Sequence, residues 1–314
     1  MSKLKRYLSK LPVISWLVKV LNAIRLPGME GLTAFNLWEI YSVGILKGAL
    51  GARANAISYS FFMAMFPFIL FVLNLIPFIA IENFQGEFIA FVNELLPAQA
   101  AGSFDDVFKE IALKQNGGLL TISFFSSLFL MANGVNAIFA GFENSYYVET
   151  SRNWLKQYGV ALGVSVMLAV FLLIGVIFTL FVEYWLNELR TTNIMTDDSL
   201  TGWLGIVRYA LLVFMLFLFV AVLYYTGTKD GRKTRFFSMG ALVTTLLVLL
   251  LSYLYGLYIE NFSSYNELYG SIGALIILMV YIWLNANLLL LGYELNVALR
   301  KLKARNLNND QQTN

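Results

Sequence analysis

The residue types that carry most enzyme chemistry are missing from this sequence, and the remaining charges point to another role. Its 314 residues include no histidine and no cysteine, which excludes imidazole bases, thiolate nucleophiles and Cys or His metal ligands. Arg53 and Glu294 each adjoin a long apolar run, where unpaired charge is costly. We predict that they pair at one membrane depth; snorkelling of each charge to the interface is the alternative. We expect no enzyme, no metal site and no cofactor.

Polar residues and prolines recur inside the apolar runs in a pattern that favours a cavity. Backbone groups freed by proline at bilayer depth must find partners in protein or water. Pro67 and Pro77 are therefore predicted to break the first strong segment beside a polar cavity, which would carry a substrate. Ordinary packing of kinked helices with small and polar stripes is the alternative. The residues assigned to this path are Asn55, Ser58, Tyr59, Pro67, Asn74, Pro77, Ser126, Asn133, Asn136, Tyr281 and Asn285.

The elements that must position these residues are membrane helices. Hydrophobic residues make up 59% of the chain and charged residues 13%, whereas soluble domains have roughly half and a quarter. The apolar residues cluster in runs of about 20, the length that crosses a hydrocarbon core. We predict an all-α polytopic membrane protein with six transmembrane helices. Their ranges are roughly 56–81, 119–141, 158–182, 204–226, 236–259 and 272–298.

The distribution of basic residues predicts the orientation. Of the 22 lysines and arginines, all but Lys109, Lys114, Arg190 and Arg208 fall on one side of this topology. Because basic residues collect on the cytoplasmic side, we expect both termini to be cytoplasmic in a plasma membrane. A spanning segment at 33–50 would give seven spans and move the basic N-terminus outside, so we place it in the interface.

The chain is predicted to divide into three parts. Residues 1–54 carry amphipathic patterns and are expected to form helices on the cytoplasmic surface. Residues 55–302 form the six-span domain. Within it, about 82–118 carries two apolar stripes, which predict a helical hairpin at the outer mouth. The polar residues 303–314 are predicted to be a disordered cytoplasmic tail.

Two long stretches carry a resemblance to a known family. The opening GARANAISYSFFMAMFPFILFVL, the last segment YGSIGALIILMVYIWLNANLLLLGYELNVAL and the triplet Arg152-Asn153-Trp154 resemble the YihY / virulence factor BrkB family, once labelled ribonuclease BN. The resemblance covers roughly residues 40–302. The sequence departs from the family where Ser238-Met239 precedes Gly240 in place of a proline. The resemblance implies a six-span protein of the bacterial inner membrane, in a family linked to serum resistance and to movement of lipids or other amphiphiles.

Two functions are compatible with these features. The first is a membrane transporter or lipid-handling protein of the cell envelope, passive or ion-coupled, with a polar cavity between spans. Its partners would be membrane lipids, anionic ones included, and not nucleic acid. The alternative is a scaffold or envelope-assembly factor that moves nothing. Ribonuclease activity is disfavoured because histidine is absent and the cytoplasmic carboxylates form no close pair. The sequence leaves the oligomeric state open, homo-oligomers included.

Overall fold

The described part of the chain is built from α-helices. The structure, a computed structural model, describes residues 50–75, 117–145, 152–191, 198–229, 231–233, 235–261 and 271–312, with four single residues at 23, 33, 35 and 38. Its elements are α4 (Leu50–Leu75), α7 (Gly117–Glu143), α8 (Trp154–Thr191), α9 (Asp198–Thr226), the 3-10 helix η2 (Gly231–Lys233), α10 (Met239–Asn261) and α12 (Ser271–Gln312). The predicted helical membrane architecture is confirmed.

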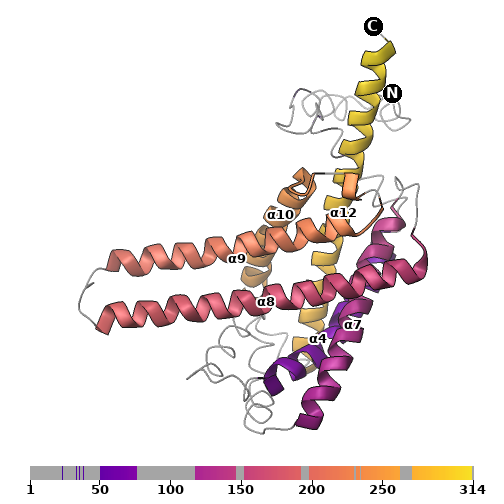
Figure 1. Ribbon diagram of the computed structural model, residues 1–314. Coiled ribbons are helices and arrows are strands. Elements are labelled where there is room, and N and C mark those ends of the chain that lie inside the picture. The colour runs from indigo at the N-terminus through magenta and orange to yellow at the C-terminus, as the bar shows by residue number, and fades with distance from the viewer. Residues whose placement is uncertain are drawn as a thin grey trace.

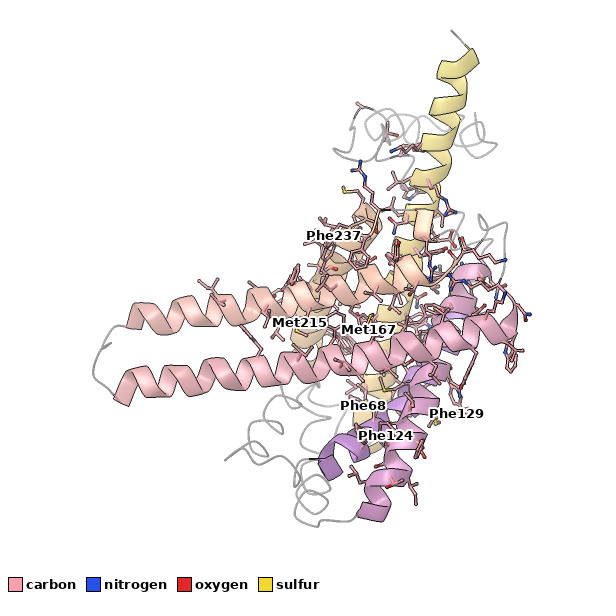
Figure 2. The ribbon with its side chains drawn as sticks, viewed as in Figure 1. Phe68, Phe124, Phe129, Met167, Met215 and Phe237 are labelled. Atoms are coloured by element: carbon pink, nitrogen blue, oxygen red, sulfur yellow. The ribbon has the colours of Figure 1, made fainter. Side chains whose placement is uncertain are left out.

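Five described helices are long and apolar enough to cross a membrane. The segments that meet this requirement of length and composition are Gly117–Glu143, Trp154–Phe171, Gly205–Thr226, Met239–Ile259 and Leu275–Arg300. Helix α4, the first of the six predicted spans, is not among them, so the count of six stays a prediction. The helices also carry exposed apolar side chains, such as Phe124 and Phe129 of α7 (Figure 2). Hydrocarbon can solvate such a surface.

The helices form a bundle from which one helical pair projects. Helix α4 packs most extensively on α7, and α12 packs on both α4 and α10. Figure 1 shows α8 and α9 running side by side and extending away from α4, α7 and α12. Among the residues whose burial is described, the pair joins the buried core at its base, through residues such as Ala161 and Leu168 of α8 and the stretch 220–224 of α9. The core therefore lies where the base of the pair meets α4, α7 and α12.

Pro67 does not break the first helix. Helix α4 continues through it from Leu50 to Leu75, whereas we predicted an interruption. A proline removes one backbone hydrogen bond and leaves the turns on either side able to form theirs. The predicted break at Pro67 is therefore wrong. Pro77 lies outside the described residues, as does nearly all of the predicted hairpin at 82–118.

The boundaries of the helical domain also differ from the prediction. Helix α4 begins at Leu50, so the predicted limit at 54/55 falls inside it, and most of 1–54 lies outside the described residues. Helix α12 has 42 residues and ends at Gln312. Most of the tail that we predicted to be disordered is therefore helical. No proline or glycine follows Gly292, and the alanine, leucine, lysine and arginine residues there favour helix.

Helix α12 is too long to lie wholly in a membrane. A helix of this length measures about 63 Å at 1.5 Å per residue, against roughly 30 Å for the hydrocarbon core. The crossing segment ends at Arg300. The remaining turns carry the chain beyond the other helices toward its C-terminus (Figure 1).

A pair of glycines brings α10 and α12 into close contact. A Cβ atom at Gly240 would overlap the Gly292 carbonyl oxygen, and one at Gly292 would overlap the Thr244 hydroxyl. Gly256 lies further along α10, and a Cβ atom added there would have no other atom within 4 Å. Backbone contact at Gly240 and Gly292 therefore fixes where the two helices cross.

We predict that Gly240→Ala destabilises the folded protein by about 1 to 3 kcal/mol, because the added methyl must push the helices apart. The measurement is the thermal unfolding midpoint of the full chain in detergent. Gly256→Ala is the matched control on α10 and should leave the midpoint unchanged or raise it. Equal effects of the two substitutions would contradict the close contact.

Candidate functional site

The two charges that we predicted to pair lie together at one end of the bundle. Both terminal guanidinium nitrogens of Arg53 in α4 donate to Glu294 Oε1 in α12, each over 3.1 Å. Arg53 Nη1 also donates to the Gly141 carbonyl oxygen at 2.9 Å, and the Ser145 hydroxyl donates to Glu294 Oε2 at 2.6 Å. We call these four residues the Arg53–Glu294 cluster. It ties α4 and α12 to the C-terminal end of α7.

Burial makes the two charges of this cluster depend on each other, because separating them would leave each ion without water or a counter-charge. Only 7% of the Arg53 side chain and 1% of the Glu294 side chain is exposed. Two such ions lose their hydration, and their attraction repays that loss only when additional hydrogen bonds satisfy the remaining groups. Gly141 and Ser145 supply two such bonds, while Arg53 Nε is buried without a partner. The geometry contrasts with the snorkelling alternative, in which each charge would reach the interface by itself.

An aromatic and hydroxyl layer packs against the same end of the bundle. The Phe142 ring stacks on Tyr293 with centroids 4.1 Å apart, and the Tyr293 hydroxyl shares a 2.7 Å hydrogen bond with the Thr228 hydroxyl. The Tyr224 hydroxyl donates to the Leu289 carbonyl oxygen at 2.7 Å and lies 2.7 Å from the Thr244 hydroxyl. These contacts connect α7, α9, α10 and α12, so the polar groups here are satisfied across helices.

Arg152 fastens the start of α8 to the end of α9. Its guanidinium donates to the carbonyl oxygens of Thr226 at 2.6 Å and Thr228 at 2.8 Å, while its backbone N–H donates to Glu143 Oε1 at 2.9 Å. Burial and the nearby Arg232 lower the pKa of Arg152, and Glu143 and Tyr293 oppose that shift. An arginine remains charged under such a shift. It therefore compensates the negative C-terminal end of α9.

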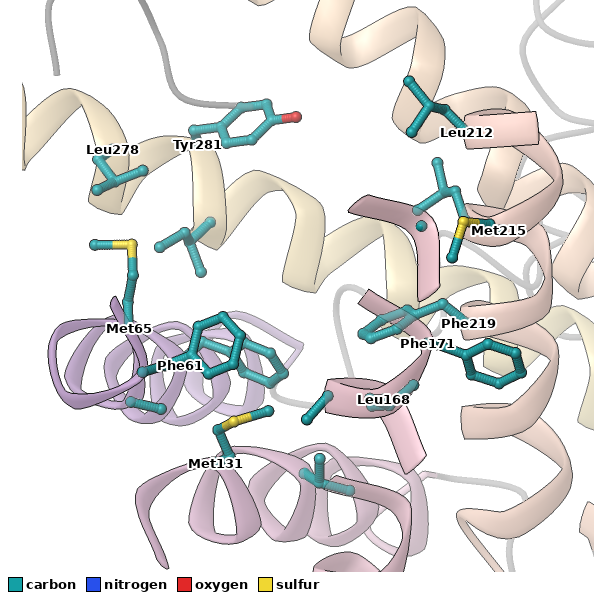
Figure 3. A pocket seen from close by; sticks show the side chains of 18 residues that line it. Phe61, Met65, Met131, Leu168, Phe171, Leu212, Met215, Phe219, Leu278 and Tyr281 are labelled. Atoms are coloured by element: carbon teal, nitrogen blue, oxygen red, sulfur yellow. The ribbon is translucent and has the colours of Figure 1, made fainter. Parts of the chain in front are cut away.

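The cavity of the bundle lies away from these charges and is apolar. It has a volume of about 510 Å³ and is lined by α4, α7, α8, α9 and α12. Figure 3 shows the side chains that face it, among them Phe61, Met131, Leu168, Met215, Phe219 and Tyr281. Only Tyr281 belongs to the predicted path, and its hydroxyl shares a 2.7 Å hydrogen bond with Ser252 of α10. The prediction of a polar lining is therefore wrong for this cavity.

The polar residues at the start of α4 do not reach the cavity. Asn55 and Tyr59 are exposed on the outside of α4, with 56% of Tyr59 accessible. Ser58 is buried, and its hydroxyl donates to the Asn55 carbonyl oxygen at 3.0 Å within the same helix. Pro67 is half-buried in α4. The side chain of Asn74 lies outside the described residues.

The predicted polar stripe of α7 lies outside the lining of the cavity, and Asn285 of α12 bonds within its own helix. Ser126, Asn133 and Asn136 are half-buried on α7 and do not line the cavity. Asn285 donates through Nδ2 to the Tyr281 carbonyl oxygen at 2.8 Å, one turn earlier in α12. Its Oδ1 is buried and has no hydrogen-bond partner. Asn285 is therefore the member of the predicted path that keeps an unused polar atom.

The sequence analysis missed most of the partners in this region. Ser145, Thr228 and Tyr293 bond across helices, yet single hydroxyl groups near the ends of apolar runs give no periodic signal. The phenylalanines and methionines that line the cavity cannot be separated by sequence pattern from those that face lipid, because both sets lie in apolar runs. Within the described ranges no group of three histidine, cysteine or acidic residues is placed to hold a metal ion.

Comparison with known proteins places the chain in a family. The family model described as virulence factor BrkB matches residues 44–314. The chain belongs to this family. The matched range includes Arg53, Arg152, Asn285 and Glu294, so the BrkB-family region contains both the buried charges and the cavity helices. No solved structure matches the chain.

Relatives of this BrkB-family chain are named as membrane proteins or as ribonuclease-like. It is 26% identical over 259 residues to the putative ribonuclease-like protein YfkH of Bacillus subtilis, covering 80% of this chain and 90% of YfkH. It is 25% identical over 273 residues to a UPF0761 membrane protein of Coxiella burnetii, covering 83% of this chain and 91% of that protein. Together with the five apolar helices, these matches identify a multi-pass membrane protein.

We predict that Arg53→Glu and Glu294→Arg each destabilise this BrkB-family protein by about 3 to 5 kcal/mol, because each leaves a buried charge without its counter-charge. The double exchange should recover part of that loss. The measurement is the free energy of unfolding in a denaturing detergent titration. Lys229→Glu, which reverses an exposed charge, is the control and should change stability little. Additive losses in the double variant would contradict direct pairing.

A milder substitution tests the role of Arg152. Arg152→Lys should destabilise the protein by about 1.5 kcal/mol, since a lysine ammonium cannot reproduce the planar guanidinium that donates to two carbonyl oxygens at once. Thermal unfolding in detergent measures the change. Lys156→Arg, at an exposed position in the first turn of α8, makes the opposite exchange and should be neutral. A neutral Arg152→Lys would show that the two carbonyl bonds contribute nothing.

Proposed function

We propose that this protein handles membrane lipids or related amphiphiles by taking a hydrocarbon chain into the cavity between its helices. The observation that carries the proposal is the cavity itself, whose walls are phenylalanine, methionine and leucine side chains. An apolar cavity excludes water. A hydrocarbon chain can fill such a space and give its walls the contacts that they would otherwise lack.

The composition of the walls suits a flexible chain. Methionine side chains are unbranched and adapt their shape, so methionine-rich surfaces bind apolar partners with little shape selection. Met65, Met131 and Met215 line the cavity from three different helices. Gly134 and Gly175 also face it, and their lack of side chains lets Phe61 and Met215 approach the neighbouring helix. The site can therefore adjust to chains that differ in conformation.

The proposal includes a location and an orientation. The skew of basic residues supports cytoplasmic termini, and membership of the BrkB family supports a location in the bacterial inner membrane. In that orientation the Arg53–Glu294 cluster lies toward the cytoplasm and closes that end of the bundle. Lipids with anionic headgroups would gather near the lysines and arginines that this orientation places on the cytoplasmic side. Movement would be passive or ion-coupled, and no catalytic step is assigned.

Ribonuclease activity receives little support. The name ribonuclease-like belongs to YfkH. RNA cleavage needs an acid and a base or a metal cluster beside the phosphate. This sequence has no histidine, and its buried acid Glu294 is engaged with Arg53 and Ser145.

A structural role is the second candidate. It is favoured by the hydrogen bonds and the ion pair of the Arg53–Glu294 cluster, which join α4, α7 and α12 at one end of the bundle as a scaffold requires. The two candidates differ in what they require of the cavity. A scaffold needs only that the helices stay together, whereas lipid handling needs the space to be accessible to a chain.

We predict that Ala169→Phe, which places a ring in the cavity from α8, weakens chain binding about 50-fold. Displacing about three methylene groups at roughly 0.8 kcal/mol each gives this figure. The measurement is binding of a radiolabelled single-chain lipid to the full chain in nanodiscs, alongside transfer of a fluorescent lipid across proteoliposomes.

Ala210→Phe is the control for that experiment, because Ala210 is exposed on α9 and does not line the cavity. It should bind and transfer lipid as the unchanged protein does. If Ala169→Phe folds and both measurements stay unchanged, lipid handling is wrong and the scaffold role stands.

A further inference from the structure

The connection between α9 and α10 carries exposed positive charge. We call Lys229, Arg232 and Arg235 the basic turn; all three residues are exposed, and none has an ion-pair partner in the described part of the chain. The segments on either side that are able to cross a membrane end at Thr226 and begin at Met239. The basic turn therefore lies at the level of the lipid headgroups, where long basic side chains can reach phosphate.

Nearby groups add to the positive potential of this turn. Burial is the main cause that lowers the pKa of Arg152, the nearness of Arg232 is the second, and Glu143 opposes them by less. Arg235 precedes the N-terminal end of α10, which is the positive end of the helix dipole, and the first turn of that helix has no acidic residue. A negatively charged ligand would compensate charges that otherwise repel one another.

An apolar stripe runs along α10 from the same end. Residues three or four apart share one face of a helix, and exposed apolar residues recur there at that spacing. We call Leu242, Leu246, Leu250, Tyr253 and Leu257 the α10 stripe. The part from Leu242 to Leu250 extends about 12 Å along the helix axis, close to the depth of one leaflet, about 15 Å or half of the hydrocarbon core. The acyl chain of a lipid bound at the basic turn can therefore lie along it.

Phe237 lies in the chain between the basic turn and the α10 stripe. Its ring stacks on Phe217 of α9, with centroids 5.6 Å apart and ring planes 8° from parallel, yet 61% of Phe237 remains exposed (Figure 2). The next residue, Ser238, caps α10 by accepting a hydrogen bond from the Ala241 N–H at 3.2 Å. The ring is thus held in place at the level where aromatic side chains contact the upper part of lipids.

We infer that the basic turn and the α10 stripe together bind one anionic phospholipid, with its phosphate at the basic turn and an acyl chain along the stripe. Charge selects the headgroup. A free phosphate would use the basic turn alone, and a second copy of this chain would use the stripe alone. No described residue of α10 lines the cavity, so this site goes beyond the proposed function and does not depend on it.

The test places a fluorophore at a single introduced cysteine, since the chain has none of its own. Leu246→Cys labels the α10 stripe, and Ile174→Cys labels another exposed apolar position, on α8. The full chain in phosphatidylcholine nanodiscs is titrated with dibrominated phosphatidylglycerol or dibrominated phosphatidylcholine, whose bromine atoms quench a fluorophore that touches an acyl chain. At Leu246, half-maximal quenching should need at least fivefold less phosphatidylglycerol, the effect of one basic residue. At Ile174 the two lipids should quench equally.

Charge variants and a soluble anion identify the headgroup contact. Arg232→Gln combined with Arg235→Gln should abolish the preference for phosphatidylglycerol at the Leu246 label. Lys156→Gln, which removes an exposed charge at the start of α8, is the control and should keep the preference. Inorganic phosphate in solution should not reverse the quenching, because it has no acyl chain to contact the stripe.

Each alternative occupant gives a different result. Equal quenching of the Leu246 label by the two lipids overturns the inference, and so does a preference that survives in the folded double variant. Reversal by inorganic phosphate would assign the basic turn to a free anion. Self-quenching between labels with no effect of either lipid would assign the stripe to a second copy of the chain, and both results overturn the inference. The cavity is tested separately by Ala169→Phe, so none of these results decides the proposed function.

Discussion

A buried charge inside a membrane protein must find its counter-charge within the chain, and this constraint organises the structure. Arg53 and Glu294 are 241 residues apart, so neither is satisfied until α4 has docked on α12. Gly141 and Ser145 complete the cluster from the end of α7. Any arrangement that separates these helices leaves two ions in a medium of low dielectric constant. The ion pair therefore favours one assembly of helices whose apolar surfaces would tolerate several.

Fixing one end of the bundle leaves the other region free to adapt. At the ion-pair end, hydroxyl, amide and guanidinium groups bond across helices, and the glycine contact of α10 with α12 sets their crossing. In the cavity, helices meet through phenylalanine and methionine side chains, which have no directional bonds to break. A ligand that enters the cavity need not disturb the groups on which assembly depends. The groups on which assembly depends and the walls of the cavity thus lie in different layers of the same helices.

The sequence predicted the features that follow from the low solubility of charged and polar groups in hydrocarbon. Membrane helices follow from uninterrupted apolar runs, and the pairing of Arg53 with Glu294 followed from the rarity of charge at that depth. The lining of the cavity could not be predicted in this way. A soluble helix shows which face is inside by its contrast of polar and apolar residues. Residues 211–223 of α9 are apolar on every face, so Met215 carries no mark that separates it from residues facing lipid.

The asparagines of α12 show the same limit at the scale of single atoms. Asn285 and Asn287 are two residues apart and make the same bond one turn back along the helix. The sequence pattern assigned Asn285, four residues after Tyr281, to the polar path and left Asn287 out, and polarity suggested that this stripe lines a cavity. Neighbouring helices decide the difference: they enclose the oxygen of Asn285 without giving it a donor. Which polar atom of a membrane helix becomes buried without a partner is therefore decided by the packing of its neighbours and not by its own sequence pattern.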